Sequence, residues 1–302
     1  NITNKKSATK TLRTVYRVAS IQDVTTARTR GDGEMVNIVE EYQKQTIESF
    51  GVRVKNGKCA FCGKDLNKNE YCDCSEATLV NRFFKKTTEK VNQLRGAFEV
   101  RNKCWDEVIK DFRPTLPKKF EGMSFDCYRA TNESQKNALR VARKYHQNAI
   151  KNYLTGMNLI FFGNYGTGKT MLMSILCEAL NRDYMLRCRY VNMVDLMNNI
   201  KATFGAKNDK TAKSVLDDYK KAEVLFLDDI DKVKPSEYLS EVFYSITNYR
   251  TEHELPTVIS ANHSLEELEA QIYGEATVSR LADINNAICV NFEHGNFRLE
   301  GV

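Results

Sequence analysis

The stretch GNYGTGKT, residues 163–170, joins the apolar run NLIFF (158–162) to a second apolar segment, MLMSILCEAL (171–180). Its glycines, lysine and threonine fit the spacing G-x4-G-K-T. Glycines let a tight loop turn its backbone N–H groups toward one point, and a helix that starts directly behind the loop adds a favourable dipole. Between a strand and a helix, this spacing is typical of a phosphate-binding loop. The stretch therefore predicts the first strand–loop–helix unit of an α/β domain.

Each position of this loop has an expected part in binding ATP. Lys169 is expected to reach the β- and γ-phosphates, and Thr170 to bind magnesium. Backbone and flanking contacts to the nucleotide are expected from Gly163, Asn164, Tyr165, Gly166, Thr167, Gly168 and Met171.

An acidic pair follows another apolar run, in LFLDDID (225–231). A carboxylate at the end of a buried strand suits a second magnesium contact, which we assign to Asp228. Asp229 is placed to orient or activate the attacking water. Glutamate is more usual at such a position and is one methylene longer, so we expect hydrolysis that is slow or dependent on a partner. Asn262, at the end of TVISAN, is a further candidate for positioning the water.

Short apolar runs alternate with longer helical stretches through the last two-thirds of the chain. Unbroken apolar runs of this length suit parallel strands that are covered on both faces. The runs are NLIFF (158–162), LRCRYV (186–191), VLFL (224–227), TVIS (257–260) and AICVNF (287–292). We predict an α/β domain with a five-stranded parallel sheet.

The chain before this domain has a different character. RPTLPKK (113–119) carries two of the four prolines and is interpreted as an interdomain linker. We expect an N-terminal domain over 1–112, a linker over 113–122 and the ATPase domain over 123–302. Within the first, a basic arm covers 1–35, a cysteine-rich module 57–75 and a long helix 76–112.

The predicted helix 76–112 has an apolar residue at every seventh position: Phe84, Val91, Phe98, Trp105 and Phe112. The stripe is either an ordinary core face or a docking face for a partner.

Four cysteines, Cys59, Cys62, Cys72 and Cys74, have the spacing C-x2-C-x9-C-x-C. Four thiolates complete a tetrahedral zinc shell and leave no position for a reactive water, so we predict a structural zinc site. The alternative is a reduced loop without metal. The other five cysteines are expected to be small core residues: Cys104, Cys127, Cys177, Cys188 and Cys289.

The 302-residue chain has a formal charge of +6, and residues 1–30 alone carry seven basic residues against one acidic residue. Such an arm can attract the phosphates of nucleic acids, or it can simply be a solvated tail. The sequence has no apolar run of about 18 residues and no signal peptide. We therefore expect a cytoplasmic protein.

From about residue 116 to 302 the chain resembles the AAA+ ATPase domain of bacterial and phage replicative helicase loaders of the DnaC/DnaI type. The resemblance begins at LPKKFEGMSFDCYRATNESQKNALRVARKY (116–145). It continues through GNYGTGKT, LFLDDID, YRTEHELPTVISAN (249–262), SRL (279–281) and NFEHGNFR (291–298).

This resemblance implies roles for further residues. Asn262 matches sensor 1, Arg298 matches sensor 2, and Arg280 matches an arginine finger that acts on ATP held by a neighbouring subunit. Lys201 and Phe204 match a basic and aromatic pair that touches single-stranded DNA, where the cation pairs with phosphate and the ring stacks on a base. Without the resemblance, Phe204 reads as a core residue.

The resemblance implies an ATPase that recruits a DnaB-type helicase hexamer through its N-terminal domain. It implies self-association through the ATP sites into a hexameric spiral that delivers the helicase to single-stranded DNA. The chain ends four residues after Arg298, so we expect no C-terminal lid. Two alternatives stay open: an IstB-like transposition helper that prefers duplex DNA, and a helicase adaptor or inhibitor that does not hydrolyse ATP.

Overall fold

The computed structural model describes residues 114–204, 211–283 and 285–293, together with short pieces at 54–55, 58–59, 86, 89–94 and 96–97. The chain divides into two compact units, Asn1–Trp105 and Asp106–Val302. The predicted basic arm and Arg298 lie outside the described residues, as do the predicted zinc ligands apart from the backbone of Cys59.

The described pieces of the first unit are a small hairpin and part of a helix. Strand β1 (Val54–Lys55) pairs antiparallel with β2 (Lys58–Cys59), and Val54 lies opposite Cys59. In the helical stretch 89–94, Val91 and Leu94 are buried, while the two residues between them are exposed. Val91, a residue of the predicted apolar stripe, is therefore buried.

A five-stranded parallel sheet forms the centre of the second unit, with the strand order β4-β5-β6-β3-β7. The strands are β3 (Asn158–Gly163), β4 (Cys188–Asn192), β5 (Val224–Asp228), β6 (Thr257–Ala261) and β7 (Ala287–Phe292). Each predicted strand is confirmed to within about two residues. Because all five strands are parallel, their carboxyl ends meet at one edge of the sheet.

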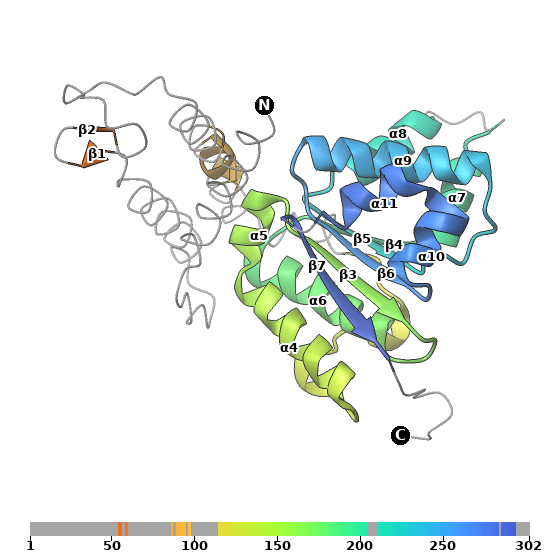
Figure 1. Ribbon diagram of the computed structural model, residues 1–302, viewed down its shortest axis with the longest axis horizontal. Helices are drawn as coiled ribbons and strands as arrows, with labels where there is room; N and C mark the ends of the chain where they lie inside the picture. Colours follow the sequence, from red (N-terminus) through yellow and green to blue (C-terminus); the bar gives the residue numbers. More distant parts are fainter. Residues whose placement is uncertain are drawn as a thin grey trace. The chain divides into compact units, whose positions relative to one another are not determined.

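Helices cover both faces of this sheet (Figure 1). One face carries α4 (Glu133–Gln147), α5 (Ala149–Thr155) and α6 (Lys169–Tyr184). The other carries α7 (Met193–Lys201), α8 (Ala212–Lys220), α9 (Glu237–Glu252), α10 (Leu265–Leu268) and α11 (Glu275–Leu281). Before α4, short 3₁₀ turns form at Lys118–Phe120 and Phe125–Cys127, and a π-helical turn, Glu269–Tyr273, follows α10.

Alternation along β5 sets which side chains face each layer. Leu225 and Leu227 belong to the core cluster that includes Phe243 of α9, which is fully buried. Burial of a phenylalanine side chain contributes about 1.5–3 kcal/mol. Successive strand residues point to opposite faces, so Phe226 and Asp228 face the α6 side, where Phe226 stacks on Tyr190 at 6.4 Å between ring centroids. Asp228 is thereby brought to the carboxyl end of the sheet, next to the start of α6.

Arg250, near the end of α9, is buried in the core and 1% exposed. Its guanidinium donates to backbone carbonyls and one hydroxyl. The acceptors are Tyr219 O, Lys220 O, Ala222 O, Pro256 O and Thr257 Oγ1, at 2.6–3.1 Å. Arginine side chains can satisfy the last carbonyls of a helix in this way, so Arg250 fastens the end of α8 to the start of β6.

The prediction for the scattered cysteines is only partly right. Cys177 and Cys188 are buried, whereas Cys127 and Cys289 are exposed. Cys127 lies in a surface 3₁₀ turn, and Cys289 points out of β7, a strand at the edge of the sheet where burial alternates.

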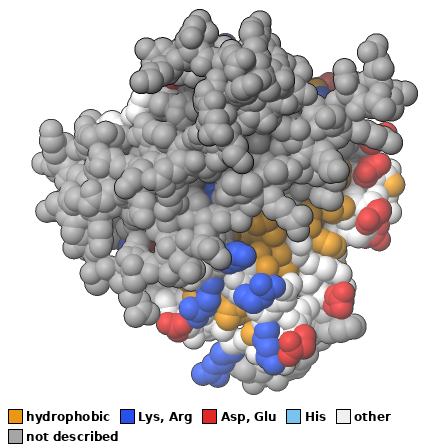
Figure 2. Space-filling model, turned by 60° about the vertical axis from the view of Figure 1, so that its left-hand side comes forward, with side chains coloured by type: hydrophobic (Ala, Val, Ile, Leu, Met, Phe, Trp, Pro, Cys, Tyr) orange, Lys and Arg blue, Asp and Glu red, His pale blue; other side chains and the backbone are white. Residues whose placement is uncertain are grey.

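Several basic side chains lie on the exposed face of α4. The exposed residues of α4 include Lys136, Arg140, Arg143 and Lys144. Two of them are paired, Lys136 with Glu133 at 2.8 Å and Arg143 with Asp126 at 2.6 Å. Figure 2 shows Lys and Arg side chains gathered beside a hydrophobic area on the described part of one face. None of the described helices is both long enough and apolar enough to span a bilayer.

Candidate nucleotide-binding site

The loop 163–168 runs from the end of β3 directly into α6, which begins at Lys169. Gly163, Gly166 and Gly168 have φ values of 119°, 74° and 93°, a region of backbone space that other residues rarely adopt. At Gly163 a Cβ atom would also lie 2.3 Å from the carbonyl oxygen of Phe292 on β7. The glycine spacing in the sequence is therefore a requirement of both the turn and the neighbouring strand.

Lys169 is folded back over this loop. Its Nζ donates to the carbonyl oxygens of Gly163 at 2.6 Å and Asn164 at 2.7 Å, and the residue is 5% exposed. Burial lowers the pKa of Lys169 to about 8, although Asp229, Asp231 and Asp228 favour its charged form. An ammonium group that is short of solvent is ready to exchange these neutral carbonyls for phosphate oxygens.

Asp228 and Thr170, the predicted magnesium ligands, are in direct contact. Thr170 Oγ1 donates to Asp228 Oδ1 at 3.2 Å, Tyr190 donates to Oδ2 at 2.6 Å, and Ser260 donates to Oδ1. Burial, followed by repulsion from Asp229, raises the pKa of Asp228 even though these hydrogen bonds oppose the rise. A buried carboxylate with a raised pKa and a hydroxyl beside it is a pair that a divalent cation would stabilise.

Asp229 turns away from Asp228 because its backbone is left-handed, with φ at 52°. Its N–H donates to Ser260 Oγ at 2.8 Å, which fixes the turn to β6. One carboxylate oxygen, Oδ2, contacts Lys232 Nζ at 2.5 Å, and the other accepts a long hydrogen bond of 3.4 Å from Asn262 Nδ2. The predicted water-orienting acid and the predicted sensor 1 residue therefore do meet.

Asp231 is a site residue that the sequence reasoning missed. Its side chain is fully buried, and it accepts hydrogen bonds from the backbone N–H groups of Asn262 at 2.5 Å and His263 at 2.8 Å. It also accepts from Asn262 Nδ2 at 3.0 Å and pairs with His263 Nδ1 at 2.7 Å. Burial raises the pKa of Asp231, but the bonds from His263 and Asn262 outweigh it and leave the pKa lowered. The third acid of LFLDDID was the available signal, and Asp231 holds the sensor loop in place.

A pocket of about 570 Å³ lies in front of the phosphate loop. The loop residues 165–171 line it together with Asp229, Lys232 and Asn262. The other lining residues come from the segment 117–129, which the sequence reasoning did not place in the site: Pro117, Lys119, Phe120, Cys127, Tyr128 and Arg129. Neighbouring basic and aromatic residues, Lys119 with Phe120 and Tyr128 with Arg129, were an available signal.

Two buried side chains, one before α4 and one in its first turn, contact the phosphate loop. Tyr128 donates to the carbonyl oxygen of Thr167 at 3.3 Å, and Gln135 Nε2 donates to the same oxygen at 3.4 Å. The amide oxygen of Gln135 also accepts from Thr131 N at 2.8 Å and completes the capping box of α4 with Asn132. One glutamine thus caps a helix and holds the phosphate loop.

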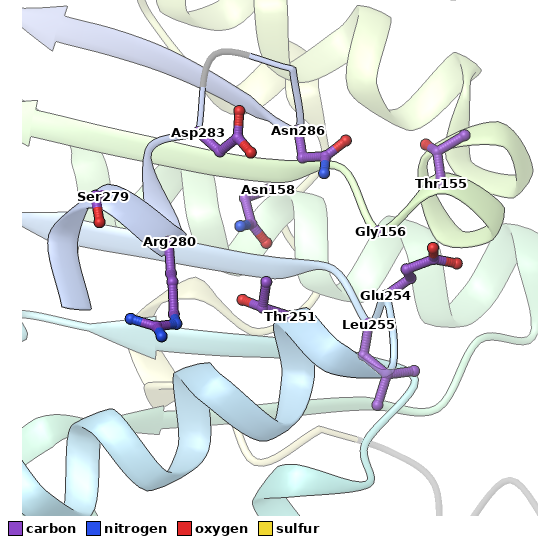
Figure 3. A pocket seen from close by; sticks show the side chains of 10 residues that line it. All are labelled: Thr155, Gly156, Asn158, Thr251, Glu254, Leu255, Ser279, Arg280, Asp283 and Asn286. Carbon is purple, nitrogen blue, oxygen red and sulfur yellow. The ribbon is translucent and has the colours of Figure 1, made fainter. Parts of the chain in front are cut away.

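Arg280 does not line this pocket. It lies on α11 at a second pocket, of about 410 Å³, whose lining includes Asn158 at the start of β3 and Glu254 after α9 (Figure 3). Its guanidinium donates to the carbonyl oxygen of Ala276 at 2.5 Å and lies 5.3 Å from the ring centre of Tyr244. The pocket is at the amino end of β3, whereas the phosphate loop is at its carboxyl end, roughly 16 Å away along the strand.

Lys201 and Phe204 lie apart from the nucleotide pocket, at the end of α7. Phe204 N donates to the carbonyl oxygen of Lys201 at 2.9 Å, and both side chains are exposed. The ring of Phe204 is 61% exposed and lies 6.4 Å from that of Tyr238. Phe204 is therefore not a core residue, and the interpretation that ignored the resemblance is wrong.

These residues fit a nucleotide with magnesium. The first N–H groups of a helix have no partner within it, so the start of α6 can donate to phosphate oxygens beside Lys169. Thr170 and Asp228 would hold the metal. Among the residues that the structure describes, no cluster of three or more His, Cys, Asp or Glu side chains could hold a metal ion.

Comparisons with known proteins identify relatives of this chain. Residues 159–283 match the family described as "ATPase family associated with various cellular activities (AAA)". The "Replicative helicase loader DnaC" of Escherichia coli (strain K12) is 30% identical over 182 residues, which cover 59% of this chain and 70% of that protein. The protein of the same name from Buchnera aphidicola subsp. Acyrthosiphon pisum is 25% identical over 189 residues, or 62% of this chain and 73% of that protein.

A solved structure, "Crystal structure of the DnaC helicase loader", has a TM-score of 0.51 to this chain and 26% identity. The match covers 58% of this chain and 99% of that one. Its extent agrees with the sequence matches, which also span about three-fifths of this chain. The chain is an AAA ATPase, and it belongs to the DnaC family of replicative helicase loaders.

Proposed function

We propose that this chain is an ATP-dependent loader that binds a DnaB-type replicative helicase hexamer and places it on single-stranded DNA when replication begins. The observation that carries the proposal is the ATPase pocket, which Lys169 lines and beside which Thr170 contacts Asp228 and Asn262 contacts Asp229. The chain that holds this pocket covers 70% of a known loader. The transposition-helper and adaptor alternatives have no comparable support.

The residues of the pocket divide the work of hydrolysis. Lys169 binds the β- and γ-phosphate oxygens. Thr170 and Asp228 would hold magnesium, which would neutralise negative charge on the phosphates. Asp229 orients the attacking water and receives its proton, and Asn262 holds the water in line. The bond from the γ-phosphorus to its bridging oxygen breaks as the bond to water forms, which yields ADP and phosphate.

Arg280 serves the ATP of a neighbouring copy. Its place at a second pocket, away from its own phosphate loop, supports this role. Each ATP then bridges two chains, so nucleotide binding would favour a ring-like or spiral assembly, for which we propose six subunits to match the helicase. Arg298, as a sensor 2 residue, would complete the pocket of its own chain.

Single-stranded DNA is proposed to bind at Lys201 and Phe204. An exposed aromatic ring beside a cation is the arrangement that base stacking and phosphate contact require. Because it lies apart from the nucleotide pocket, DNA and ATP can be held at the same time.

The N-terminal domain, residues 1–112, is proposed to recruit the helicase. Cys59, Cys62, Cys72 and Cys74 would hold one structural zinc, for which the spacing of the thiols is the support. Elemental analysis of the purified protein should find about one zinc per chain. A zinc content far below one per chain would exclude the site, and so would a zinc content that does not change in Cys72→Ser.

Co-purification with the host's replicative helicase tests the loading function. We expect the complex to form with ATP and the helicase to transfer to a circular single-stranded DNA, and Lys169→Ala to abolish transfer. Lys213→Ala, at an exposed lysine of α8, is the control. A preference for long duplex DNA without helicase binding would favour the transposition helper. Helicase binding without ATP turnover, with or without single-stranded DNA, would favour the adaptor.

A further inference from the structure

We infer that Lys232 is a second phosphate-binding cation that exchanges between Asp229 and the γ-phosphate. While it pairs with Asp229 the acid is not available to the attacking water, and when it moves to the γ-phosphate the acid is released. This inference rests on the proposed ATPase site. It adds that Lys232 lets the site distinguish ATP from ADP.

Lys232 has the required position. Its Nζ is 2.5 Å from Asp229 Oδ2, with 40% of the lysine side chain and 19% of the aspartate side chain exposed. Lys232 also lines the nucleotide pocket, together with Lys169, Thr170 and Asn262. The same ammonium group is therefore within the pocket that receives the phosphates and in contact with the acid that serves the water.

The ion pair occupies one of the two oxygens of Asp229, and Asn262 occupies the other. Asn262 has little freedom, because Asp231 holds both its backbone N–H at 2.5 Å and its side-chain amide at 3.0 Å. Lys232 is on a flexible four-carbon stem and is partly solvated, and such ion pairs are weak. Of these two partners of Asp229, Lys232 is the one that can leave.

A γ-phosphate gives Lys232 a reason to leave. It carries more negative charge than a carboxylate and offers several oxygens, so it competes well for an ammonium group. Lys169 serves the same phosphates but is already buried against the loop. Lys119 and Arg129 also line the pocket, but they come from the segment 117–129, and it is Lys232 that is paired with Asp229.

The exchange makes Asp229 available only when ATP is bound. With Lys232 on the γ-phosphate, Asp229 Oδ2 can accept the proton of the attacking water while the water oxygen bonds to phosphorus and the bond to the ADP oxygen breaks. With ADP, no γ-phosphate is present and Lys232 returns to Asp229. The pair therefore discriminates between the two nucleotides by a contact that only one of them can make.

Binding measurements on the full chain test this inference. Dissociation constants for the non-hydrolysable analogue AMPPNP and for ADP are measured for wild type, Lys232→Met, Lys232→Arg and Lys234→Met. Lys234 is an exposed lysine two residues further along that is absent from the pocket lining. Loss of a charged hydrogen bond to phosphate predicts an AMPPNP-over-ADP preference about tenfold smaller in Lys232→Met, with ADP affinity unchanged within about twofold. Lys232→Arg and Lys234→Met should keep the wild-type preference.

The outcomes separate this inference from the proposed ATPase site. If wild type binds both nucleotides and Lys232→Met keeps its preference, the exchange is wrong and the ATPase site stands. If wild type binds neither nucleotide, the ATPase site itself fails and the inference fails with it. Lys232→Gln is a second neutral variant should Lys232→Met not fold, and equal loss of AMPPNP and ADP binding in both would show a structural role and overturn the inference.

Discussion

Asp229 combines an acidic side chain with a left-handed backbone. Residues with a Cβ pay a steric penalty at positive φ, and aspartate and asparagine are enriched there because their short polar side chains bond locally. With φ at 52° and its N–H held by Ser260, this turn suits an aspartate. The shorter acid noted in the sequence is therefore compatible with the geometry of the turn.

Asp229→Asn should separate ATP binding from hydrolysis. Asparagine tolerates the same backbone, but it cannot take a proton from water, so turnover should fall at least about 100-fold. The affinity for ADP should change little, because the phosphate loop is untouched. Steady-state phosphate release and ADP titration measure the two effects. Asp217→Asn, at an ion-paired acid on α8, is the control, and normal turnover in Asp229→Asn would remove Asp229 from the mechanism.

Asp231→Asn should impair turnover through Asn262. The carboxylate accepts two backbone N–H groups of the sensor loop, and an amide in its place turns at least one acceptor into a donor. Because a buried donor is then left facing a donor, we expect the free energy of unfolding to fall by about 1–3 kcal/mol. Turnover should fall about tenfold at saturating ATP, because even a small displacement of Asn262 misplaces the attacking water. Urea unfolding and kcat measure the two effects, and an unchanged kcat would show that the sensor does not need this support.

At the scale of elements, the strands could be predicted and their order could not. Each strand is a local apolar run with turn residues around it, so its position is written in neighbouring residues. The order β4-β5-β6-β3-β7 depends on where each helix carries the chain, which no local pattern encodes. The same limit explains the site. The phosphate loop and the acidic pair are local motifs, whereas Tyr128 joins the loop only through folding, 39 residues before Thr167 in the chain.

Tyr128→Phe tests whether the segment before α4 supports the phosphate loop. The variant removes one of the two side-chain donors to Thr167 O and leaves the buried ring in place. We expect a loss of about 1 kcal/mol in the free energy of unfolding. We also expect ADP affinity to fall about fivefold, because the loop is less well fixed. Tyr238→Phe, at an exposed tyrosine, should change neither quantity. If Tyr128→Phe matches that control, the segment lines the pocket without holding the loop.

At the scale of the whole molecule, the sharing of ATP sites between copies can be tested by mixing. The Arg280→Ala variant has an intact phosphate loop but no arginine finger. The Lys169→Ala variant has the arginine finger but a defective phosphate loop. Each alone should lose at least about 100-fold in turnover. If the finger acts on a neighbour, a mixture of the two should regain measurable turnover, since some interfaces pair an intact loop with an intact finger. Arg140→Ala, at an exposed arginine of α4, is the control. A mixture as inactive as its parts would mean that Arg280 acts within its own chain or not at all.

The guanidinium of Arg250 joins the end of α8 to Pro256, which directly precedes β6. Helix α8 follows the proposed DNA-binding residues in the chain, and β6 leads into Asn262. The acceptors of these hydrogen bonds are neutral. Added salt therefore has no ion pair to screen there, and mild acid has no carboxylate to protonate. High ionic strength would weaken the binding of a nucleic acid at Lys201 and leave the contacts of Arg250 intact. Binding of DNA at Lys201 would therefore depend on ionic strength, whereas the Arg250 contacts between α8 and β6 would not.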